Sequence, residues 1–366
     1  MEGDLIKTNR WLLPLSFLYG MGVRLRNELF EMGILKERSY DVPVIGVGNI
    51  TVGGTGKTPM TEYLVRLLHE EFRVAVVSRG YKRKSKGFVL ANDTTTAWEI
   101  GDEPYQIKKK FHNVTVAVDK CRRRAIEHLT RYDDGPGTDV IIMDDAFQHR
   151  YVKPGINILL VDYHRMVGDD CLLPAGRLRE PVESMYRAGI VVVTKCPAQM
   201  NPMEFRVIKK QLHLYPFQKL YYATIEYKDM HQLFGTNTKP LQSLAHDRQV
   251  LLLNAIATPE QMKADIKQYA TNVSTLAFPD HHYFTPNDAK SINAAFASLH
   301  TPATIVVTEK DAARLLTLKG LNNNTRNAIY VLPIEMTIMQ NKQNEFNENI
   351  LNYVHKNKRN SKLPEN

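Results

Sequence analysis

The chain has 366 residues, of which 43% are hydrophobic and 24% charged, and this composition excludes an intrinsically disordered or fibrous protein. The formal net charge is +9, which is compatible with phosphorylated substrates, an anionic membrane surface or nucleic acid and does not choose among them. The three cysteines, Cys121, Cys171 and Cys196, form no C-x-x-C pair, which argues against a disulfide framework or a zinc site and favours a reducing compartment.

The first predicted element is a helix in the N-terminal segment, residues 1–35. Apolar residues recur there at helical spacing, at Leu15, Leu18, Met21, Leu25 and Leu29. The uncharged stretch 11–23 is shorter than the roughly 20 apolar residues that span a bilayer, and no small-residue cleavage site follows it, so we expect a retained segment. The pattern, with arginines at its flanks, is typical of an amphipathic helix in a membrane interface. The alternative is a helix packed on the first domain, and both hold if the two faces differ.

The strongest motif follows the next predicted strand, Pro43–Val47. It is Gly-Asn-Ile-Thr-Val-Gly-Gly-Thr-Gly-Lys-Thr over residues 48–58, and a predicted helix, Pro59–Leu68, comes after it. This order of elements is typical of a P-loop, whose backbone N–H groups cradle phosphates. The predicted nucleotide-binding residues are Thr51, Val52, Gly53, Gly54, Thr55, Gly56, Lys57 and Thr58. Lys57 is expected on the β- and γ-phosphates and Thr58 on Mg²⁺. Thr51 stands where the usual motif has its first glycine, and the alternative is a glycine-rich turn with a chance Gly-Lys-Thr.

Short apolar runs rich in Val and Ile continue along the chain, and helix-like segments separate most of them. They lie at 73–77, 114–118, 140–143, 156–161 and 190–193. Such alternation predicts an α/β fold with a parallel sheet and helices on both faces, as in P-loop kinases. A second set, at 250–253 and 304–307 with a helix over 286–299, predicts a smaller C-terminal α/β domain. The aromatic stretch Lys219–Tyr227 is predicted to connect the two, so the expected domains are 36–218 and 219–366.

Acidic residues and a histidine pair follow some of these elements. The apolar strand 140–143 leads into Asp144 and Asp145, and an acid at this place in P-loop proteins orients Mg²⁺. Asp102, in a loop ahead of a predicted helix, is a candidate base for a hydroxyl proton. His281 follows an aspartate in the second domain and is a candidate proton relay. The alternatives are a turn-capping acid pair, a helix N-cap and a surface histidine, respectively.

Seven motifs occur in a fixed order within residues 10–335. They are Asn49–Thr58, Ser-Arg-Gly-Tyr at 78–81, Gly-Asp-Glu-Pro at 101–104, Asp-Asp-Ala-Phe-Gln-His at 144–149, Pro-Ala-Gly-Arg-Leu-Arg-Glu-Pro at 174–181, Phe-Pro-Asp-His-His-Tyr at 278–283 and Thr-Glu-Lys-Asp at 308–311. The ordered set resembles the bacterial lipid A kinase family, the tetraacyldisaccharide 4'-kinases. That family usually has Gly after the acid pair, and this chain has Ala146, which disfavours a left-handed backbone and leaves a different local turn open.

The resemblance implies an enzyme that uses ATP and Mg²⁺ to phosphorylate the 4'-hydroxyl of a tetraacylated glucosamine disaccharide 1-phosphate, giving lipid IVA. Asp102 would take the hydroxyl proton, His281 would support it across an interdomain cleft, and Asp144 and Asp145 would hold the metal. Contacts with the substrate are implied for Arg79, Tyr81, Glu103, Arg122, Gln148, His149, Arg177 and Arg179. For each arginine the alternative is an ordinary surface ion pair.

The resemblance also implies a peripheral protein on the anionic cytoplasmic face of the bacterial inner membrane, monomeric and without a nucleic-acid partner. The alternative function is a membrane-associated P-loop ATPase switch. The loops of such switches carry a lysine just before the two glycines, where this chain has Val52. A third possibility, a small-molecule kinase with no membrane role, leaves the N-terminal helix unexplained.

Overall fold

The computed structural model describes residues 8–130, 137–247, 249–255, 259–279 and 282–360. The chain divides into two compact units. The first unit comprises Met1–Ile225 and Met336–Asn366, and the second comprises Glu226–Glu335. In the sequence, the second unit is therefore an insertion within the first.

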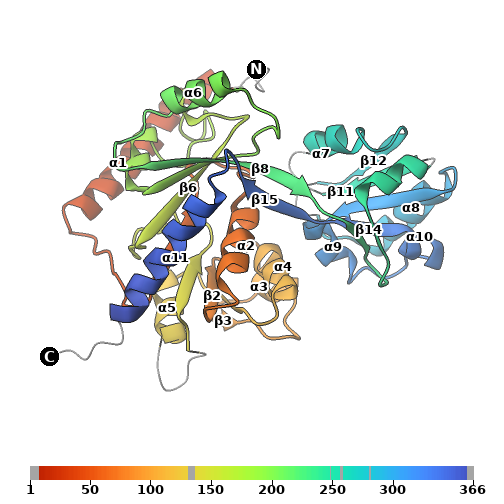
Figure 1. The fold of residues 1–366 in the computed structure, drawn as a ribbon, viewed down its shortest axis with the longest axis horizontal. Helices are drawn as coiled ribbons and strands as arrows, with labels where there is room; N and C mark the ends of the chain where they lie inside the picture. Colours follow the sequence, from red (N-terminus) through yellow and green to blue (C-terminus); the bar gives the residue numbers. More distant parts are fainter. Residues whose placement is uncertain (1–7, 131–136, 248, 256–258, 280–281, 361–366) are drawn as a thin grey trace. The chain divides into compact units, whose positions relative to one another are not determined.

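The first unit is built on a nine-stranded sheet in the order β15-β8-β7-β6-β1-β5-β2-β4-β3 (Figure 1). Its strands are β1 (Val44–Gly48), β2 (Val74–Ser78), β3 (Val89–Leu90), β4 (Thr115–Val118), β5 (Val140–Met143), β6 (Ile156–Asp162), β7 (Ile190–Thr194), β8 (Lys219–Tyr227) and β15 (Ile334–Ile338). Neighbouring strands from β8 to β4 pair in parallel, and β3 pairs antiparallel with β4. The predicted parallel α/β sheet is confirmed, and each apolar run expected in it forms a strand.

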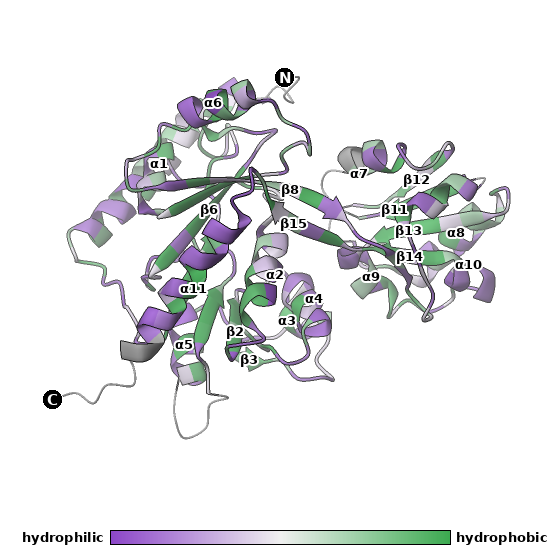
Figure 2. Cartoon of the chain, viewed as in Figure 1, coloured by the Kyte–Doolittle hydropathy of each residue, from purple (hydrophilic) through white to green (hydrophobic). Residues whose placement is uncertain are grey.

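Helices cover both faces of this sheet, because successive residues of a strand point to opposite sides. Ile158 and Leu160 of β6 join the core beneath α2 (Lys57–Leu68), α4 (Asp102–Lys110) and α11 (Gln343–Asn360). Leu159 and Val161 join the core on the other face, beneath α6 (Pro202–Gln211). A further core on that second face includes residues of α5 (Arg122–Thr130). The strands between these layers are coloured as hydrophobic in Figure 2.

The second unit has a six-stranded sheet in the order β10-β9-β14-β13-β11-β12. Its strands are β9 (Met230–Gln232), β10 (Thr238–Lys239), β11 (Gln249–Asn254), β12 (Val273–Ala277), β13 (Ala303–Thr308) and β14 (Ile329–Leu332). Its helices are α7 (Pro259–Ile266), α8 (Pro286–Ala297), α9 (Glu309–Leu315) and α10 (Asn323–Ala328). Pairing from β12 to β14 is parallel, so the predicted second α/β set is present.

The limits of the two units differ from the sequence-based limits in two places. β8, expected as a connection, pairs in parallel with β7 from Lys219 to Tyr222 and so extends the first sheet. Residues from Met336 onwards, expected in the second domain, return to the first unit, where Phe346 and Ile350 are fully buried in its core. The sequence could not predict this return, because β15 and α11 follow the elements of the second unit in the chain and so were assigned to it.

The N-terminal segment forms α1 (Leu13–Glu31), as its periodicity predicted. Among the residues that the structure describes, no helix is long and apolar enough to cross a membrane.

Candidate active site

The phosphate-binding loop leaves the carboxyl end of β1 and enters α2. Gly56 caps α2 with a left-handed backbone, φ +83°, which glycine adopts without steric cost. Asn49 is fully buried, and its side-chain amide donates to the Thr55 hydroxyl at 2.8 Å, which braces the loop from inside. Lys57 begins the helix, and its Nζ lies 3.5 Å from Asn49 Oδ1 and 3.5 Å from Asp145 Oδ1. The ammonium group and the helix N-terminus together form a positive site suited to phosphate.

A second segment, containing Arg177 and Arg179, holds the other side of this loop. The Val52 N–H donates to the Arg177 carbonyl at 2.8 Å, and the Arg179 N–H donates to the Ile50 carbonyl at 2.7 Å. Between these bonds Thr51 forms a β-bridge with Leu178. Among the described residues Thr51 is not one with a left-handed backbone, so the loop does not require glycine at that position.

The two acids that follow β5 lie in different surroundings. Asp144 is buried, and it accepts long hydrogen bonds of 3.4 Å from the hydroxyls of Thr61 and Ser78. Burial, and next the charge of Asp145, raise the pKa of Asp144 to about 6. Burial also disfavours the charge of Asp145, but Lys57, Arg179 and Arg122 outweigh it and lower the pKa of this carboxyl. The alternative, a solvated pair that caps a turn, does not fit a buried Asp144 and an Asp145 that is paired with Lys57 and Arg179.

The turn after β5 accommodates Ala146 without strain at that residue. The left-handed backbone falls one residue earlier, on Asp145 with φ +48°, a conformation that aspartate tolerates better than most residues. The Ala146 N–H donates to the Val47 carbonyl at 3.0 Å, so the turn is tied to β1. Residue 146 does not need a left-handed backbone here, so alanine in place of the usual glycine does not force a different turn.

Arginines and two polar side chains surround the acid pair. Arg179 Nη1 lies 3.3 Å from Asp145 Oδ1 and 3.4 Å from Gln148 Oε1, while Arg122 Nη2 donates to the Asp145 carbonyl at 3.4 Å. Gln148 Nε2 donates to the Asn49 carbonyl at 2.7 Å, which joins this turn to the phosphate loop. Burial, followed by the charge of Arg122 and other arginines, lowers the pKa of His149 to about 4, so its ring is neutral at neutral pH. These cations and neutral donors form a surface suited to an anionic or hydroxyl-rich ligand.

Asp102 lies at the same edge of the sheet. It is the first residue of α4, and the N-cap is Gly101, so Asp102 is not the capping residue that the alternative described. A Cβ on Gly101 would lie 3.0 Å from the Tyr81 carbonyl oxygen, so the two loops pack directly on each other. Asp102 is 4% exposed, and the charge of its neighbour Glu103 acts on Asp144.

The remaining predicted residues are placed less closely. Arg79 is exposed, and its charge acts on Arg122 and His149. Tyr81 is 57% exposed. Arg177 meets the loop through its backbone carbonyl. His281 lies outside the described residues.

One cation that the sequence did not single out lies against the phosphate loop. Arg165 follows the carboxyl end of β6, and its Nη1 would lie 3.4 Å from a Cβ placed on Gly53. Within the described part of the chain, no hydrogen bond or ion pair engages the Arg165 guanidinium. The available signal was its position four residues after the predicted strand 156–161, since parallel strands bring such residues to one edge.

One face of α1 packs on the loops of this site. Arg26 Nη2 donates to the Gln148 carbonyl at 3.0 Å, and the Tyr19 hydroxyl donates to the Arg179 carbonyl at 2.8 Å. The other face is apolar and open: Phe17, Leu18 and Leu25 are 64%, 62% and 60% exposed. Both interpretations of the N-terminal helix therefore have a structural basis, each for a different face.

The residues at the end of β5 and the start of α2 fit a divalent cation. Asp144, Asp145 and the Thr58 hydroxyl supply oxygen donors, which Mg²⁺ prefers. Burial and the charge of Asp145 raise the pKa of Asp144, and the charges of Lys57 and Arg122 oppose this rise only in part. A cation at this place would supply the remaining compensation.

Comparisons with known proteins find relatives that match nearly the whole chain. A family model described as tetraacyldisaccharide-1-P 4'-kinase matches residues 8–355. The chain is 54% identical over 363 residues to the tetraacyldisaccharide 4'-kinase of Phocaeicola vulgatus, covering 99% of each chain. It is 49% identical to the protein of the same name in Bacteroides fragilis (strain ATCC 25285), covering 100% of this chain and 98% of that one. Among solved structures, LpxK from Aquifex aeolicus in complex with ATP superposes with a TM-score of 0.72 at 28% identity, covering 94% of this chain and 98% of that one.

Proposed function

The chain belongs to the tetraacyldisaccharide-1-P 4'-kinase family, and on that premise we propose how its residues divide the work of phosphoryl transfer. The enzyme phosphorylates the 4'-hydroxyl of tetraacyldisaccharide 1-phosphate at the expense of ATP, in lipid A biosynthesis. In the reaction the bond between the β,γ-bridging oxygen and the γ-phosphorus breaks, and a bond forms from the 4'-oxygen to that phosphorus. The hydroxyl proton must leave to a base.

The phosphate loop holds the nucleotide. Residues 51–58 form the phosphate loop. Backbone N–H groups of its glycines surround the phosphates, and Lys57 contacts the β- and γ-phosphates. The Val52 N–H instead holds the loop in place through the Arg177 carbonyl. The support is the position of Lys57 Nζ, 3.5 Å from Asp145, at the N-terminus of α2. Arg165, next to Gly53, adds a second positive charge to the triphosphate.

Asp144, Asp145 and Thr58 would hold Mg²⁺, and their oxygen donors support this assignment. When bound, the ion offsets negative charge on the phosphates during transfer. The protein prepares the place for it by burying Asp144 and by directing Lys57 and Arg179 at Asp145.

Asp102 acts as the base that accepts the 4'-hydroxyl proton, and His281 supports it. The burial of Asp102 beside the loop of Tyr81, at the edge that carries the acid pair, supports the assignment. A positioned base typically contributes about 10²–10⁴-fold to the rate.

The substrate is bound by polar and cationic side chains around this edge. They are Arg79, Tyr81, Glu103, Arg122, Gln148, His149, Arg177 and Arg179. Their arrangement about Asp145 supports contacts with the saccharide hydroxyls and with its phosphate. The neutral ring of His149 can donate or accept a hydrogen bond without adding a charge.

The lipid is reached at the anionic cytoplasmic face of the inner membrane, where the protein acts as a peripheral monomer. The exposed apolar face of α1 supports this placement. An apolar hollow of about 420 Å³ between α1 and Leu172, lined by Leu13, Phe17 and Gly20, opens beside that face.

The observation that carries the proposal is the 3.5 Å ion pair between Lys57 and Asp145, which follows β5. Lys57→Ala removes the charge directed at the transferring phosphate, and kcat with ATP and lipid acceptor in detergent should fall by at least a hundredfold, or about 3 kcal/mol. Thin-layer chromatography of labelled lipid product measures the transfer. Lys153→Ala, which removes an exposed lysine remote from the loop, is the matched control and should leave kcat unchanged.

The melting temperature of both variants verifies that they are folded. A folded Lys57→Ala protein that keeps more than about a tenth of the wild-type kcat, a barrier change below about 1.4 kcal/mol, would sink the assignment.

A further inference from the structure

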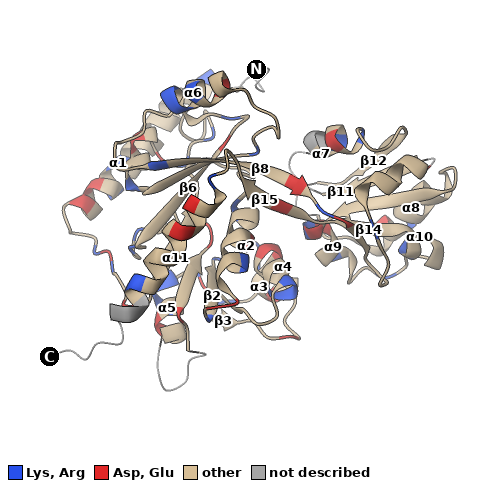
Figure 3. Ribbon diagram, in the orientation of Figure 1, with Lys and Arg blue, Asp and Glu red and all other residues tan. Residues whose placement is uncertain are grey.

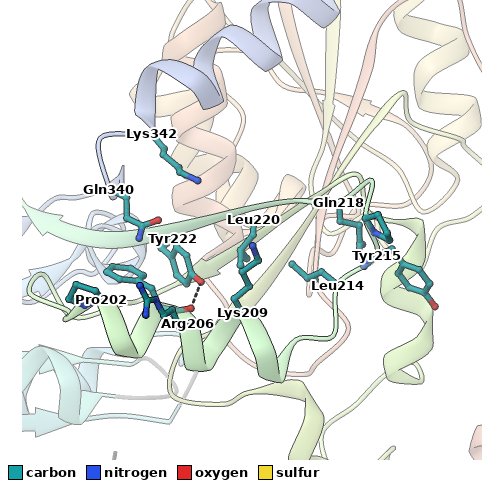
Figure 4. A pocket seen from close by; sticks show the side chains of 12 residues that line it. Pro202, Arg206, Lys209, Leu214, Tyr215, Gln218, Leu220, Tyr222, Gln340 and Lys342 are labelled. Carbon is teal, nitrogen blue, oxygen red and sulfur yellow. Dashed lines mark hydrogen bonds between the residues drawn. The ribbon is translucent and has the colours of Figure 1, made fainter.

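The first unit contains a second concave site, away from the phosphate loop. It is a groove of about 560 Å³ between α6, β8 and the segment that follows β15 (Figure 4). Phe205 and Tyr222 form its floor, with ring centroids 4.7 Å apart, and the Tyr222 hydroxyl donates to the Phe205 carbonyl at 2.8 Å. Gln218 is fixed by hydrogen bonds of 2.7 and 2.8 Å to the carbonyls of Met185 and Ala188. The floor is therefore pre-formed.

The charge of the groove is positive. Arg206, Lys209 and Lys342 line it, and none of its lining residues is acidic. Within the described residues, these three cations form no ion pair and no side-chain hydrogen bond. Three uncompensated cations over an apolar floor suit an anion attached to an apolar group. Lys and Arg on α6 are visible in Figure 3.

Exposed apolar side chains beside the lining residues favour a lipid over a free anion. Met203 and Phe217 directly follow the lining residues Pro202 and Pro216 and are 65% and 61% exposed, and Phe217 stacks with the lining residue Tyr215 at a centroid distance of 5.8 Å. Aromatic side chains beside basic ones are typical of surfaces that sit at the headgroup level of a bilayer.

The groove and α1 belong to the same face of the first sheet. Leu172, which touches the position of Gly20 on α1, packs on the same core as Ile208 and Leu212 of the α6 region. The loop on which α1 packs and the α6 region therefore share one core on this side of the sheet.

We propose that this groove binds the phosphate-bearing headgroup of an anionic phospholipid and acts as a second membrane contact, separate from the acceptor lipid and from α1. The proposal rests on the membrane placement given under the proposed function. It adds a site of defined chemistry, in which Arg206, Lys209 and Lys342 neutralise the phosphate, while Met203 and Phe217, next to lining residues in the chain, contact acyl chains.

The test is co-sedimentation of the full-length chain with vesicles of phosphatidylcholine alone or mixed with phosphatidylglycerol. The triple variant Arg206→Gln, Lys209→Gln, Lys342→Gln should lose at least about tenfold in affinity for the phosphatidylglycerol vesicles, since each basic residue near an anionic surface contributes about fivefold. Its binding to phosphatidylcholine vesicles, and its kcat on detergent-solubilised substrate, should not change.

The matched control removes three other positive charges, with Lys86→Gln, Lys109→Gln and Lys153→Gln, none of which lies on α1, on α6 or in the groove. An equal loss in the control, or no loss in the groove variant, would overturn the proposal. So would displacement of the wild-type protein by excess glycerol 3-phosphate, since that would mean a site for a free anion. Absence of phosphoryl transfer in detergent would instead refute the proposed function and leave the vesicle result to stand separately.

Discussion

Asp144 and Asp145 leave the same strand but meet opposite electrostatic surroundings. Burial and its neighbour raise the pKa of Asp144 to about 6, whereas Lys57, Arg179 and Arg122 overcome burial and lower the pKa of Asp145. Neighbouring acids whose pKa values are driven apart are frequent at catalytic and metal sites. Near neutral pH both are ionised in the free protein, and Asp144 carries the charge that a cation would compensate.

Arg165 is the residue whose role is least expected from the motifs. If its guanidinium contacts the triphosphate, Arg165→Gln should lower kcat/KM for ATP about thirtyfold, or about 2 kcal/mol, as for loss of a charged hydrogen bond. Steady-state titration of ATP at saturating lipid in detergent measures this change. Arg165→Lys, which keeps the charge, should recover part of the loss.

Arg206→Gln is the control for Arg165, because it removes an exposed arginine of the same unit outside the catalytic edge. An Arg165→Gln enzyme indistinguishable from this control would show that the guanidinium only lies beside the loop.

The sequence predicts those site residues that lie directly beside a recognisable strand or helix in the chain. The phosphate loop, the acids after β5 and Asp102 are all marked by a strand or helix directly before or after them. Arg165 lies near Gly53 only because β6 pairs with β1 in the folded sheet, and no local pattern contains that pairing.

Among the elements, α1 has two faces with different surroundings. Its inner face is fixed to the active-site loops by Tyr19, Arg26 and Asn27, whose partners lie in the turns after β5 and before η3 (Val182–Arg187). Its outer face exposes Phe17, Leu18 and Leu25. Periodicity predicted the helix, but the chain positions of its partners, more than 100 residues away, could not show which side would be covered.

Polar replacement of the outer face tests its membrane role without disturbing the inner one. Phe17→Ser, Leu18→Ser and Leu25→Ser together should shift the protein from the membrane to the soluble fraction and raise KM for lipid more than KM for ATP. The reason is the loss of apolar area that would be buried in the bilayer, about 1.5–3 kcal/mol for each side chain buried fully. The melting temperature should change little, because these side chains contact solvent.

The control for α1 is Leu316→Ser, an exposed apolar residue of the second unit. Equal membrane recovery of the α1 variant and this control would favour a helix that serves only to pack on the first unit.

For the whole molecule, the main feature is the path of the chain, which leaves the first unit on β8 and returns to it on β15. The Met339 N–H donates to the Tyr222 carbonyl at 2.9 Å, and the Lys228 N–H donates to the Pro333 carbonyl at 3.0 Å. The same register places Ile225 opposite Met336, so the chain leaves and re-enters the first unit on adjacent strands. Sequence patterns predicted two α/β units, but they could not assign the last strand and helix to the first unit.

This path predicts that the second unit can be removed. Replacing residues 226–335 with a short Gly-Ser turn should leave a folded first unit that binds ATP, since its two largest cores contain no residue of the second unit. Phosphoryl transfer should be lost, because His281 is predicted to support the base. Circular dichroism, a fluorescent ATP analogue and the transfer assay measure the three properties.

The control for that deletion is His281→Ala in the full chain, which should lose transfer and retain ATP binding in the same way. Transfer by the shortened chain at the wild-type rate would show that the second unit does not take part in the chemistry.

The division of labour among the acids is the central claim, and a Mg²⁺ titration of kcat at saturating lipid and ATP tests it most directly. Asp102→Ala should lower kcat by about 10²–10⁴-fold, which is the typical contribution of a general base. It should leave the half-saturating Mg²⁺ concentration nearly unchanged. Asp145→Ala should raise that concentration and weaken ATP binding as well, since its charge would hold the ion. If Asp102→Ala shifts the Mg²⁺ midpoint as far as Asp145→Ala does, Asp102 belongs to the metal site and is not the base.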